Sequence, residues 1–464
     1  PYRRQRQMCI RDRCKSEPKY QFKCQGETVL KHRPVVVGFG PAGMFCAYML
    51  AKYGYKPLII ERGSRVEERT KKVQDFWNGG RLDTECNVQF GEGGAGTFSD
   101  GKLNTGIKDK QNRINLVLET FVKFGAPENI LYDSKPHIGT DILCTIVKNM
   151  RTYIEQKDGT FLFDTALTSI EHKDNTIQRI KLSDGSVIDT DICILAVGHS
   201  ARDTFEMLNK AGISMQQKPF AVGVRVEHKQ KTINKSQYGF EDNRLGAANY
   251  KLTYKGTDNR GVYSFCMCPG GYVVNSSSEN NCLVVNGMSY NSRLGENANS
   301  AIVVTVTPAD YESDSPLAGV YFQRKLEQKA FEAGKGKIPV QKLGDFRKSS
   351  ITQSFGSIKP SIKGEFTFAD INKILPPYLC DSIKDAMKHF GTIIEDFNND
   401  DVILSAVESR TSSPVRIIRD DSFQSSIKGL YPAGEGAGYA GGITSAAIDG
   451  IKIFEYVGKN FKPY

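Results

Sequence analysis

The stretch VVVGFGPAGMF, residues 35–45, restricts the possible fold of this 464-residue chain more than any other stretch. Its three valines predict a buried strand, and the residues after them predict a helix with Pro41 in the first turn. KPLIIE, residues 56–61, predicts a second strand after that helix. Because strand, helix and strand form a βαβ unit, the sequence predicts an α/β protein that begins with a Rossmann-like domain.

Three glycines place the dinucleotide pattern G-x-G-x-x-G between that strand and that helix. Gly38 permits a tight turn, Gly40 lets a pyrophosphate approach the amides at the positive helix end, and Gly43 lets the helix pack on the strand. Glu61 closes the second strand, where it is expected to accept hydrogen bonds from both hydroxyls of an adenosine ribose and to disfavour NADP. The contacts expected here are Gly38, Gly40, Pro41, Ala42, Gly43, Glu61 and Arg62.

A second glycine-rich stretch, YPAGEGAGYAGGITSAAIDG at residues 431–450, runs into a predicted helix near the end of the chain. Its Gly434 and Glu435 resemble the acidic pair that binds the ribityl and pyrophosphate groups of FAD in glutathione-reductase-like flavoproteins. The helix beginning near Gly442 would direct its positive end at the flavin ring. DICILAVGHSARD, residues 191–203, resembles the middle strand turn of the same proteins. The matches predict noncovalent FAD, with contacts at Ala196, Gly198, Gly434, Glu435, Gly441, Gly442 and Ile443.

The loop GEGGAGTFSDGKLNTG, residues 91–106, is expected to pass beside the flavin ring, because its glycines allow close backbone contact. Lys102 is the candidate catalytic residue, placed to act on flavin N5 or on a substrate oxyanion. The alternative is a surface loop whose lysine is solvated. The expected cofactor contacts in this loop are Gly93, Gly94, Ala95, Gly96 and Thr97.

Over nearly all of residues 18–464, the sequence resembles the uncharacterised bacterial FAD-dependent dehydrogenase family of NAD(P)/FAD-dependent oxidoreductases. The motifs that carry this resemblance are VVVGFGPAGMFCAYMLA, QFGEGGAGTFSDGKLNTG, YSFCMCPGGYVVN, NGMS and YPAGEGAGYAGGITSAA. The resemblance implies a flavin domain with a second domain inserted over the ring, and it implies little about the substrate.

The expected architecture is a discontinuous Rossmann-like FAD-binding domain with an inserted mixed α+β substrate or cap domain. Residues 34–218 and 401–464 are predicted to form the FAD-binding domain, and alternating apolar runs after Pro219 predict a largely antiparallel sheet within the insertion, residues 219–400. Residues 1–33 are predicted to be a basic segment that is disordered, or in part an artefact of sequencing over residues 1–13.

The net charge of +10 looks at first like a nucleic-acid signal. Residues 1–33 contain ten Lys and Arg against three acidic residues, so the rest of the chain carries about +3 and nucleic acid is not favoured as a partner. The sequence has no apolar run long enough for a membrane span, and no signal peptide is recognised in it. A cytoplasmic protein without a membrane partner is therefore expected.

The eleven cysteines do not have the paired Cys/His spacing of a metal site, and none is predicted. Cys266 and Cys268 stand two apart in FCMCPGG, so on a regular strand they would face the same side. A packing role is favoured for them, with a redox role as the alternative.

The sequence therefore predicts an FAD-dependent oxidoreductase that acts on a small molecule by hydride transfer at the flavin. Only one G-x-G-x-x-G, at residues 38–43, opens a predicted βαβ unit, so NAD(P)H, if it is the donor, is expected to bind transiently. A flavin-dependent RNA-modifying enzyme and a non-enzymatic flavin-binding redox or assembly module are the alternatives.

Overall fold

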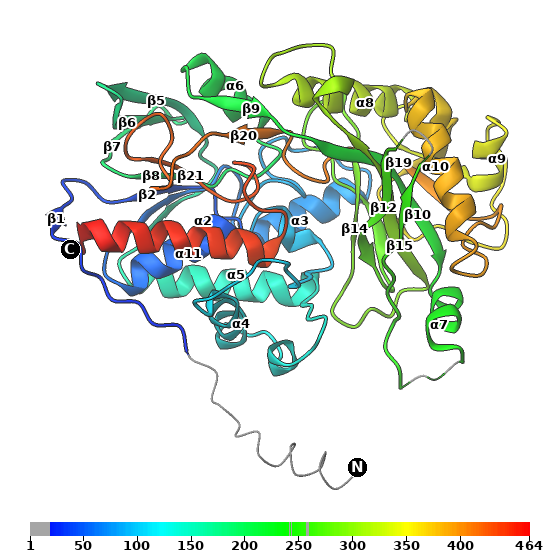
Figure 1. Cartoon of the computed structure of the whole chain (residues 1–464), viewed down its shortest axis with the longest axis horizontal. Helices are drawn as coiled ribbons and strands as arrows, with labels where there is room; N and C mark the ends of the chain where they lie inside the picture. The colour runs from blue at the N-terminus through cyan, green and yellow to red at the C-terminus, as the bar shows by residue number, and fades with distance from the viewer. Residues whose placement is uncertain (1–18, 241, 243, 257–258) are drawn as a thin grey trace, which may run out of the picture.

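The computed structural model describes residues 19–464 except 241, 243, 257 and 258. It has two parts that lie side by side, each built around its own sheet (Figure 1). The expectation of a sequencing artefact at residues 1–13 lies outside the described residues.

The first part contains a five-stranded parallel sheet in the order β21-β8-β2-β3-β4. Its central strand β2 buries Val36 in a helical core on one face, and Val35 and Val37 in a second core on the other face. β21 comes from the far end of the chain and pairs with β8, so this Rossmann-like domain is discontinuous, as predicted. The strands are β2 Val35–Val37, β3 Leu58–Ile60, β4 Thr160–Leu162, β8 Cys193–Leu195 and β21 Leu430–Pro432.

Helices cover one face of this sheet, and a three-stranded antiparallel meander covers the other (Figure 1). α2 and α11 pack so closely that a Cβ on Gly450 would lie 2.1 Å from the carbonyl oxygen of Ala42. The elements are α2 Pro41–Lys52, α3 Val66–Trp77, η1 Ala95–Phe98, α4 Arg113–Lys123, η2 Glu128–Leu131, α5 Thr140–Glu155, β5 Leu167–Lys173, β6 Thr176–Leu182, β7 Val187–Asp189, α6 Arg202–Lys210 and α11 Ile443–Asn460.

Residues 19–33 are part of this fold, so the expectation of a disordered segment is wrong for them. β1 (Thr28–Val29) pairs with β22 (Phe461–Lys462), and the ring of Phe22 lies 5.1 Å from that of Phe454. The expectation of disorder rested on the basic composition of the segment. Its alternating apolar residues pack on α11.

The second part is built on a seven-stranded, mainly antiparallel sheet in the order β11-β12-β15-β10-β19-β16-β18, with one parallel pair, β16-β18. Its strands are β10 Phe220–Lys229, β11 Thr253–Lys255, β12 Gly261–Cys268, β15 Asn297–Val306, β16 Ile338–Lys342, β18 Phe366–Phe368 and β19 Ile403–Glu408. A small sheet adds β13 Tyr272–Asn275, β14 Val285–Met288 and β17 Ile362–Lys363. The other elements of this part are α7 Gln230–Tyr238, η3 Pro308–Asp310, α8 Ala318–Gly334, α9 Leu343–Arg347, η4 Ile371–Lys373 and α10 Pro377–Phe390. β9 Met215–Gln217 and β20 Val415–Ile417 pair with each other and pack on the second core of the first part.

The domain boundary expected at residue 400 is wrong, as the pairing of β19 shows. This strand pairs with β10 and β16, so residues 403–408 belong to the sheet of the inserted part rather than to the FAD-binding domain. The sequence pattern predicted the strand but not its partners, because β10 is about 180 residues away in the chain.

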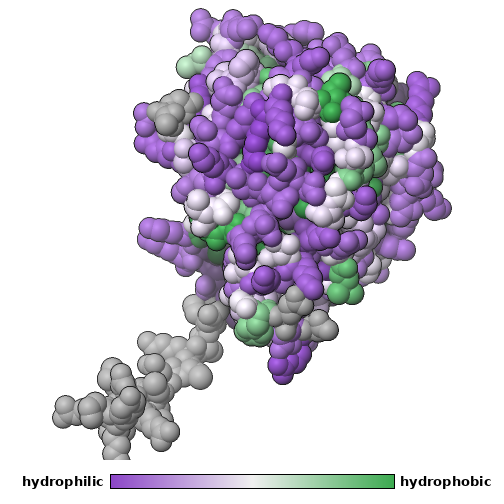
Figure 2. All heavy atoms as spheres, turned by 90° about the vertical axis from the view of Figure 1, so that its right-hand side faces the viewer, coloured by the Kyte–Doolittle hydropathy of each residue, from purple (hydrophilic) through white to green (hydrophobic). Residues whose placement is uncertain are grey.

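The outer face of the inserted part is mainly hydrophilic, with apolar residues in small separate groups (Figure 2). In the part of the chain that the structure describes, we find no helix with both the length and the apolar character that crossing a membrane requires.

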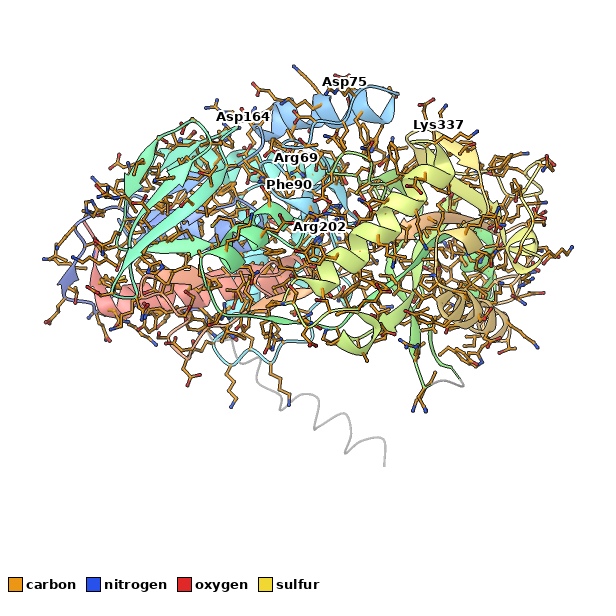
Figure 3. The ribbon with its side chains drawn as sticks, turned by 90° about the horizontal axis from the view of Figure 1, so that it is seen from above. Arg69, Asp75, Phe90, Asp164, Arg202 and Lys337 are labelled. Atoms are coloured by element: carbon orange, nitrogen blue, oxygen red, sulfur yellow. The ribbon has the colours of Figure 1, made fainter. Side chains whose placement is uncertain are left out.

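A buried carboxylate joins the two parts. Glu327 on α8 is fully buried and accepts hydrogen bonds from Arg202 of α6 at 2.7 and 2.9 Å. Arg410, which follows β19, donates to the same carboxylate at 2.7 and 2.9 Å. Figure 3 shows Arg202 near the middle of the molecule, beside α8. Burial by itself would raise the pKa of Glu327, but the two guanidinium groups lower it well below its ordinary value.

We expect Glu327→Gln to destabilise the protein by about 3–5 kcal/mol at pH 7, because it leaves two buried arginines without their counter-charge. The lowered pKa means that the carboxylate contributes its full stability above about pH 4.3, and that this contribution is lost as the pH falls further. Urea unfolding at several pH values measures both effects: the difference between wild type and variant should shrink in acid. Glu332→Gln, an exposed change on the same helix, is the control. Equal stability of Glu327→Gln and wild type at pH 7 would contradict the prediction.

Candidate functional site

A cavity of about 390 Å³ lies between the two parts and is lined by both. The FAD-binding part contributes the turn after β2, the end of β3, the loop at residues 94–104, the turn after β8 and the start of α11. The inserted part contributes Phe265 and Cys266 from β12, Asn286 from β14, and Arg410 with Thr411 after β19. The cavity is thus an apolar cleft with a few polar groups, as is usual for a cofactor and small-molecule site.

Most of the predicted site residues line this one cavity, although they come from five separate segments. They are Gly38, Gly40, Pro41, Ala42, Glu61, Arg62, Gly94, Ala95, Gly96, Lys102, Ala196, Gly198, Glu435, Gly441, Gly442 and Ile443. Four others lie behind the lining, namely Gly43, Gly93, Thr97 and Gly434.

The glycines of the site fall into two kinds. A Cβ on Gly43 would lie 1.9 Å from the carbonyl oxygen of Gly38, and one on Gly434 would lie 2.7 Å from the Cβ of Ala42. These positions let the backbone pack on itself. A Cβ on Gly40 would meet only the Cα of Gly94, at 3.7 Å, and one on Gly441 would meet nothing within 4 Å. The open glycines are those with space for a ligand against the main chain.

Glu61 holds together three segments of the cavity wall. Its buried carboxylate accepts hydrogen bonds from the amides of Phe39 at 2.8 Å, Gly63 at 3.1 Å and Gly91 at 3.1 Å. A carboxylate has about four acceptor positions, so three are used and one is left for a ligand. The sequence expectation of hydrogen bonds to both ribose hydroxyls exceeds what this geometry leaves free.

Arg69 fixes residues 87–94, which lead into the glycine-rich loop at residues 91–106. It lies on α3, is fully buried, and donates only to backbone carbonyls of these residues (Figure 3). The acceptors are the carbonyl oxygens of Asn87, Val88, Gly91, Glu92 and Gly94, at 2.7–3.2 Å. The sequence does not indicate this role for Arg69, because an arginine in a charged helix gives no signal that it is buried.

Lys102 faces the cavity with its side chain 35% exposed, and its Nζ lies 3.8 Å from the carboxylate of Asp100. Asp100 is buried and also binds Arg293 of the inserted part. Burial alone would raise the pKa of Asp100, but Lys102 and Arg293 lower it. The same loop is tied to α11, because Thr444 donates to the carbonyl of Leu103 at 2.7 Å. The lysine therefore stands on a fixed loop.

Two more groups of the cavity have shifted pKa values. Burial raises the pKa of Glu435 to about 7, with Lys218 acting in the opposite direction. Burial, helped by the charges of Arg410 and Arg202, lowers the pKa of His199 to about 3. His199 is therefore neutral at physiological pH, with its Nδ1 at 2.9 Å from the hydroxyl of Ser200. The sequence alone did not single out His199 or Arg410 as residues of the site.

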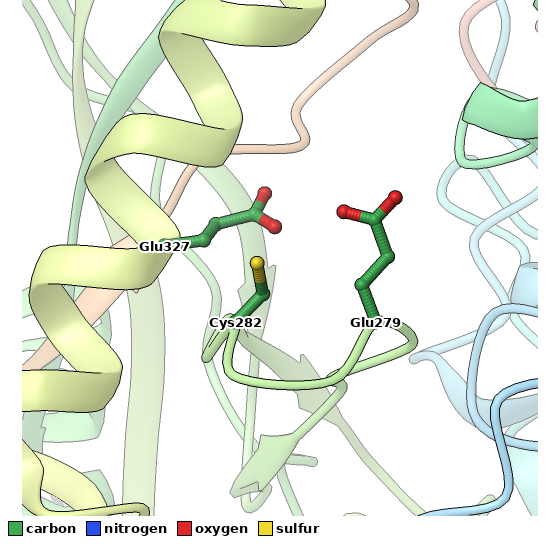
Figure 4. Close-up of side chains that lie close together, drawn as sticks. All are labelled: Glu279, Cys282 and Glu327. Carbon is green, nitrogen blue, oxygen red and sulfur yellow. The ribbon is translucent and has the colours of Figure 1, made fainter.

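Glu279, Cys282 and Glu327 also converge beside this region, and Figure 4 shows their ligand atoms turned toward one another. Their carboxylates already bind arginines: Arg202 contacts both, and Arg324 contacts Glu279 at 2.8 Å. The group is thus an ion-pair cluster in which the negative charge is compensated.

Comparison with known proteins agrees with this architecture. A family model described as FAD-dependent protein, C-terminal domain-like, matches residues 219–411. An uncharacterised protein of Clostridium beijerinckii is 50% identical over 442 residues, which are 94% of this chain and 82% of that protein. Among solved structures, CtdE in complex with FAD and a substrate covers 92% of this chain and 82% of its own, with 12% identity and a TM-score of 0.42. L-proline dehydrogenase from P. horikoshii covers 93% and 94%, with 13% identity and a TM-score of 0.39.

The nucleotide-binding turn on a parallel sheet, with an inserted domain matched by a family of FAD-dependent proteins, defines an FAD-dependent flavoprotein. Its cofactor is FAD. At 50% identity over nearly the whole chain, the protein belongs to the same family as the C. beijerinckii protein, and the family resemblance seen in its motifs is confirmed. The two solved structures are too distant to transfer a role to any residue.

We expect Glu61→Gln to destabilise the FAD-binding part by about 1–3 kcal/mol, because an NH2 group, which cannot accept, would replace one carboxylate oxygen and face at least one backbone N–H. Urea unfolding of the FAD-free protein measures this cost separately from cofactor binding. Glu68→Gln, an exposed change on α3, is the matched control. If Glu61→Gln unfolded at the wild-type urea concentration, the three amide contacts would not be the constraint that we infer.

Proposed function

We propose that the central cavity holds FAD, with the adenosine at Glu61 and residues 165–167, and that a small substrate is oxidised or reduced there by hydride transfer. The flavin ring would lie toward Lys102, the start of α11 and the inserted part. Bound FAD supplies an acceptor and donor of hydride, and the protein supplies position and electrostatics.

The observation that carries this proposal is the position of the open glycines. Gly40 at one helix start and Gly441 and Gly442 at another border the same cavity, and a Cβ on any of them would meet no atom closer than 3.7 Å. Two helix N-termini therefore border one cavity, each with open space beside its glycines. This arrangement fits a pyrophosphate at α2 and the electron-rich end of a reduced flavin at α11.

The side chains around the cavity have distinct proposed roles. Lys102 would stabilise negative charge on a substrate oxygen or near flavin N5, and Glu435 would accept hydrogen bonds from the ribityl hydroxyls. Neutral His199 and Asn286 would orient the substrate with uncharged hydrogen bonds. Arg410 would present its positive charge from the inserted part.

The form of the cavity favours an enzyme over the two alternatives. A non-enzymatic flavin module needs no groups that contact a substrate beside the ring. This cavity is bordered by polar groups from both parts, which could contact one. An RNA-modifying enzyme needs a basic face, whereas the chain after residue 33 carries about +3 in total.

The overall test is anaerobic reduction of the purified protein with NADH, NADPH or reduced ferredoxin, followed by reoxidation with a panel of small acceptors. Rapid flavin reduction with weak, transient nicotinamide binding would support the proposal. A protein that contains FAD but transfers electrons with none of these donors and acceptors would favour the non-enzymatic module.

Gly40→Val should abolish FAD binding and leave the fold intact, because the space that its side chain would occupy contains no protein atom closer than the Cα of Gly94. Gly43→Ala is the contrasting variant: its Cβ would overlap the carbonyl of Gly38, so it should lose stability as well as flavin. Flavin absorbance per protein and the melting temperature of the FAD-free protein separate the two effects. Full flavin content in Gly40→Val would show that the pyrophosphate does not bind at this turn.

Lys102→Met should slow flavin reduction or reoxidation about tenfold or more, with FAD content preserved, because it removes the charge and keeps most of the stem. A tenfold loss corresponds to about 1.4 kcal/mol of transition-state stabilisation. Stopped-flow measurement of both half-reactions gives the rates, and Lys108→Met, an exposed lysine of the same segment, is the control. Wild-type rates and flavin potential in Lys102→Met would show that this lysine takes no part in the chemistry.

A further inference from the structure

Cys266 and Cys268 lie at a β-bulge at the end of β12. Phe265 pairs with Ala301 and Cys268 pairs with Asn299, so Cys266 and Met267 together face the single residue between those partners. The φ angle of Cys266 is 43°, in a region that side chains other than glycine rarely adopt. Bulges redirect side chains, and they are common beside active sites. The regular alternation assumed from the sequence spacing is therefore interrupted at this pair.

The bulge places the two cysteines in different surroundings, although the residues still contact each other. Cys266 lines the central cavity, and Cys268 is fully buried behind it. The Sγ of Cys268 donates to the carbonyl oxygen of Cys266 at 3.3 Å. The inner sulfur therefore lies against the backbone of the residue whose thiol borders the cavity.

Arg225 and Lys102 flank this pair, and Glu408, 3.5 Å from Arg225, compensates part of their positive charge. Arg225 of β10 is fully buried and donates to the carbonyl oxygen of Cys266 at 2.7 Å and to the Sγ of Cys268 at 3.5 Å. The hydrogen bond from Cys268 lowers the pKa of Cys266 against the effect of burial, and Lys102 and Arg225 lower it further. Burial and the neighbouring sulfur raise the pKa of Cys268. Both directions favour ionisation at Cys266 over Cys268, and the more readily ionised thiol of a pair is the more nucleophilic one.

Other cysteines of the chain show what a packing role looks like. Cys46, Cys193 and Cys380 are buried in hydrophobic cores, and burial raises the pKa of each. None of these three lines the cavity.

We propose that Cys266 and Cys268 form a redox-active dithiol–disulfide couple that exchanges electrons with FAD in the central cavity. In the oxidising direction, the Cys266 thiolate and the Cys268 thiol form one S–S bond as the S–H bond of Cys268 breaks. The two electrons and the one proton released pass to oxidised FAD, which gives the reduced anionic flavin, so atoms and charge balance. In reverse, reduced FAD cleaves the disulfide. The inference rests on the proposed placement of FAD in this cavity.

The test counts electrons in the FAD-containing protein. After mild oxidation and removal of the oxidant, anaerobic titration with dithionite should consume four electrons per FAD in the wild type, two for the flavin and two for the disulfide. Cys266→Ser and Cys268→Ser should each consume two. Cys380→Ser, a buried cysteine of the same part, should consume four and is the matched control.

Peptide mapping of the wild type gives a readout that does not depend on a variant folding. The peptide with Cys266 and Cys268 should resist alkylation after oxidation and be lighter by two hydrogens, and it should take up two alkyl groups once the flavin has been reduced. Uptake of only two electrons by the oxidised wild type, with both thiols open to alkylation, would overturn the couple. Purification of the protein without flavin, and failure to bind added FAD, would instead overturn the placement of FAD.

Discussion

The contact between Glu327 and its two arginines is the interaction on which the site depends, because it joins the two parts whose surfaces form the cavity. Arg202 belongs to a helix of the FAD-binding part, Glu327 to α8, and Arg410 to the segment that leads back from the inserted sheet. A charge pair of this kind is costly to bury, so its stability depends on all partners being present. Arg410 also borders the cavity, which couples the junction directly to the site.

The cofactor wall is held by buried polar contacts that are equally specific. Glu61 accepts from amides in three segments, and Arg69 donates to backbone carbonyls at residues 87–94. Both side chains bind backbone rather than other side chains, so they fix the path of the loops. A rigid wall of this kind can present open glycines to a ligand without the loops collapsing into the space, which supports the proposed FAD site.

The inserted part adds the groups that make the cavity chemically distinctive. Phe265 and Cys266 come from a strand of the seven-stranded sheet and Asn286 from a strand of the small sheet, and Cys266 lies at a bulge. The motifs YSFCMCPGG and NGMS carry the family resemblance, and the structure places residues of both at the cavity. Their meeting with Lys102 of the FAD-binding part concentrates positive charge beside a thiol, which is the basis of the proposed electron exchange.

The sequence by itself determined the βαβ unit, the nucleotide-binding turn and FAD as the cofactor, because these depend on local patterns: three valines, three glycines at set spacing, and a helix directly after Gly442. It did not determine which glycines face a ligand, since Gly43 and Gly40 differ only in what packs opposite them. It also missed that β19 joins the inserted sheet, that Arg69 is buried and that Cys266 turns into the cavity. Those features were decided by the tertiary structure, because strand partners, burial and the direction of a side chain at a bulge depend on residues far away in the chain, and no local pattern records them.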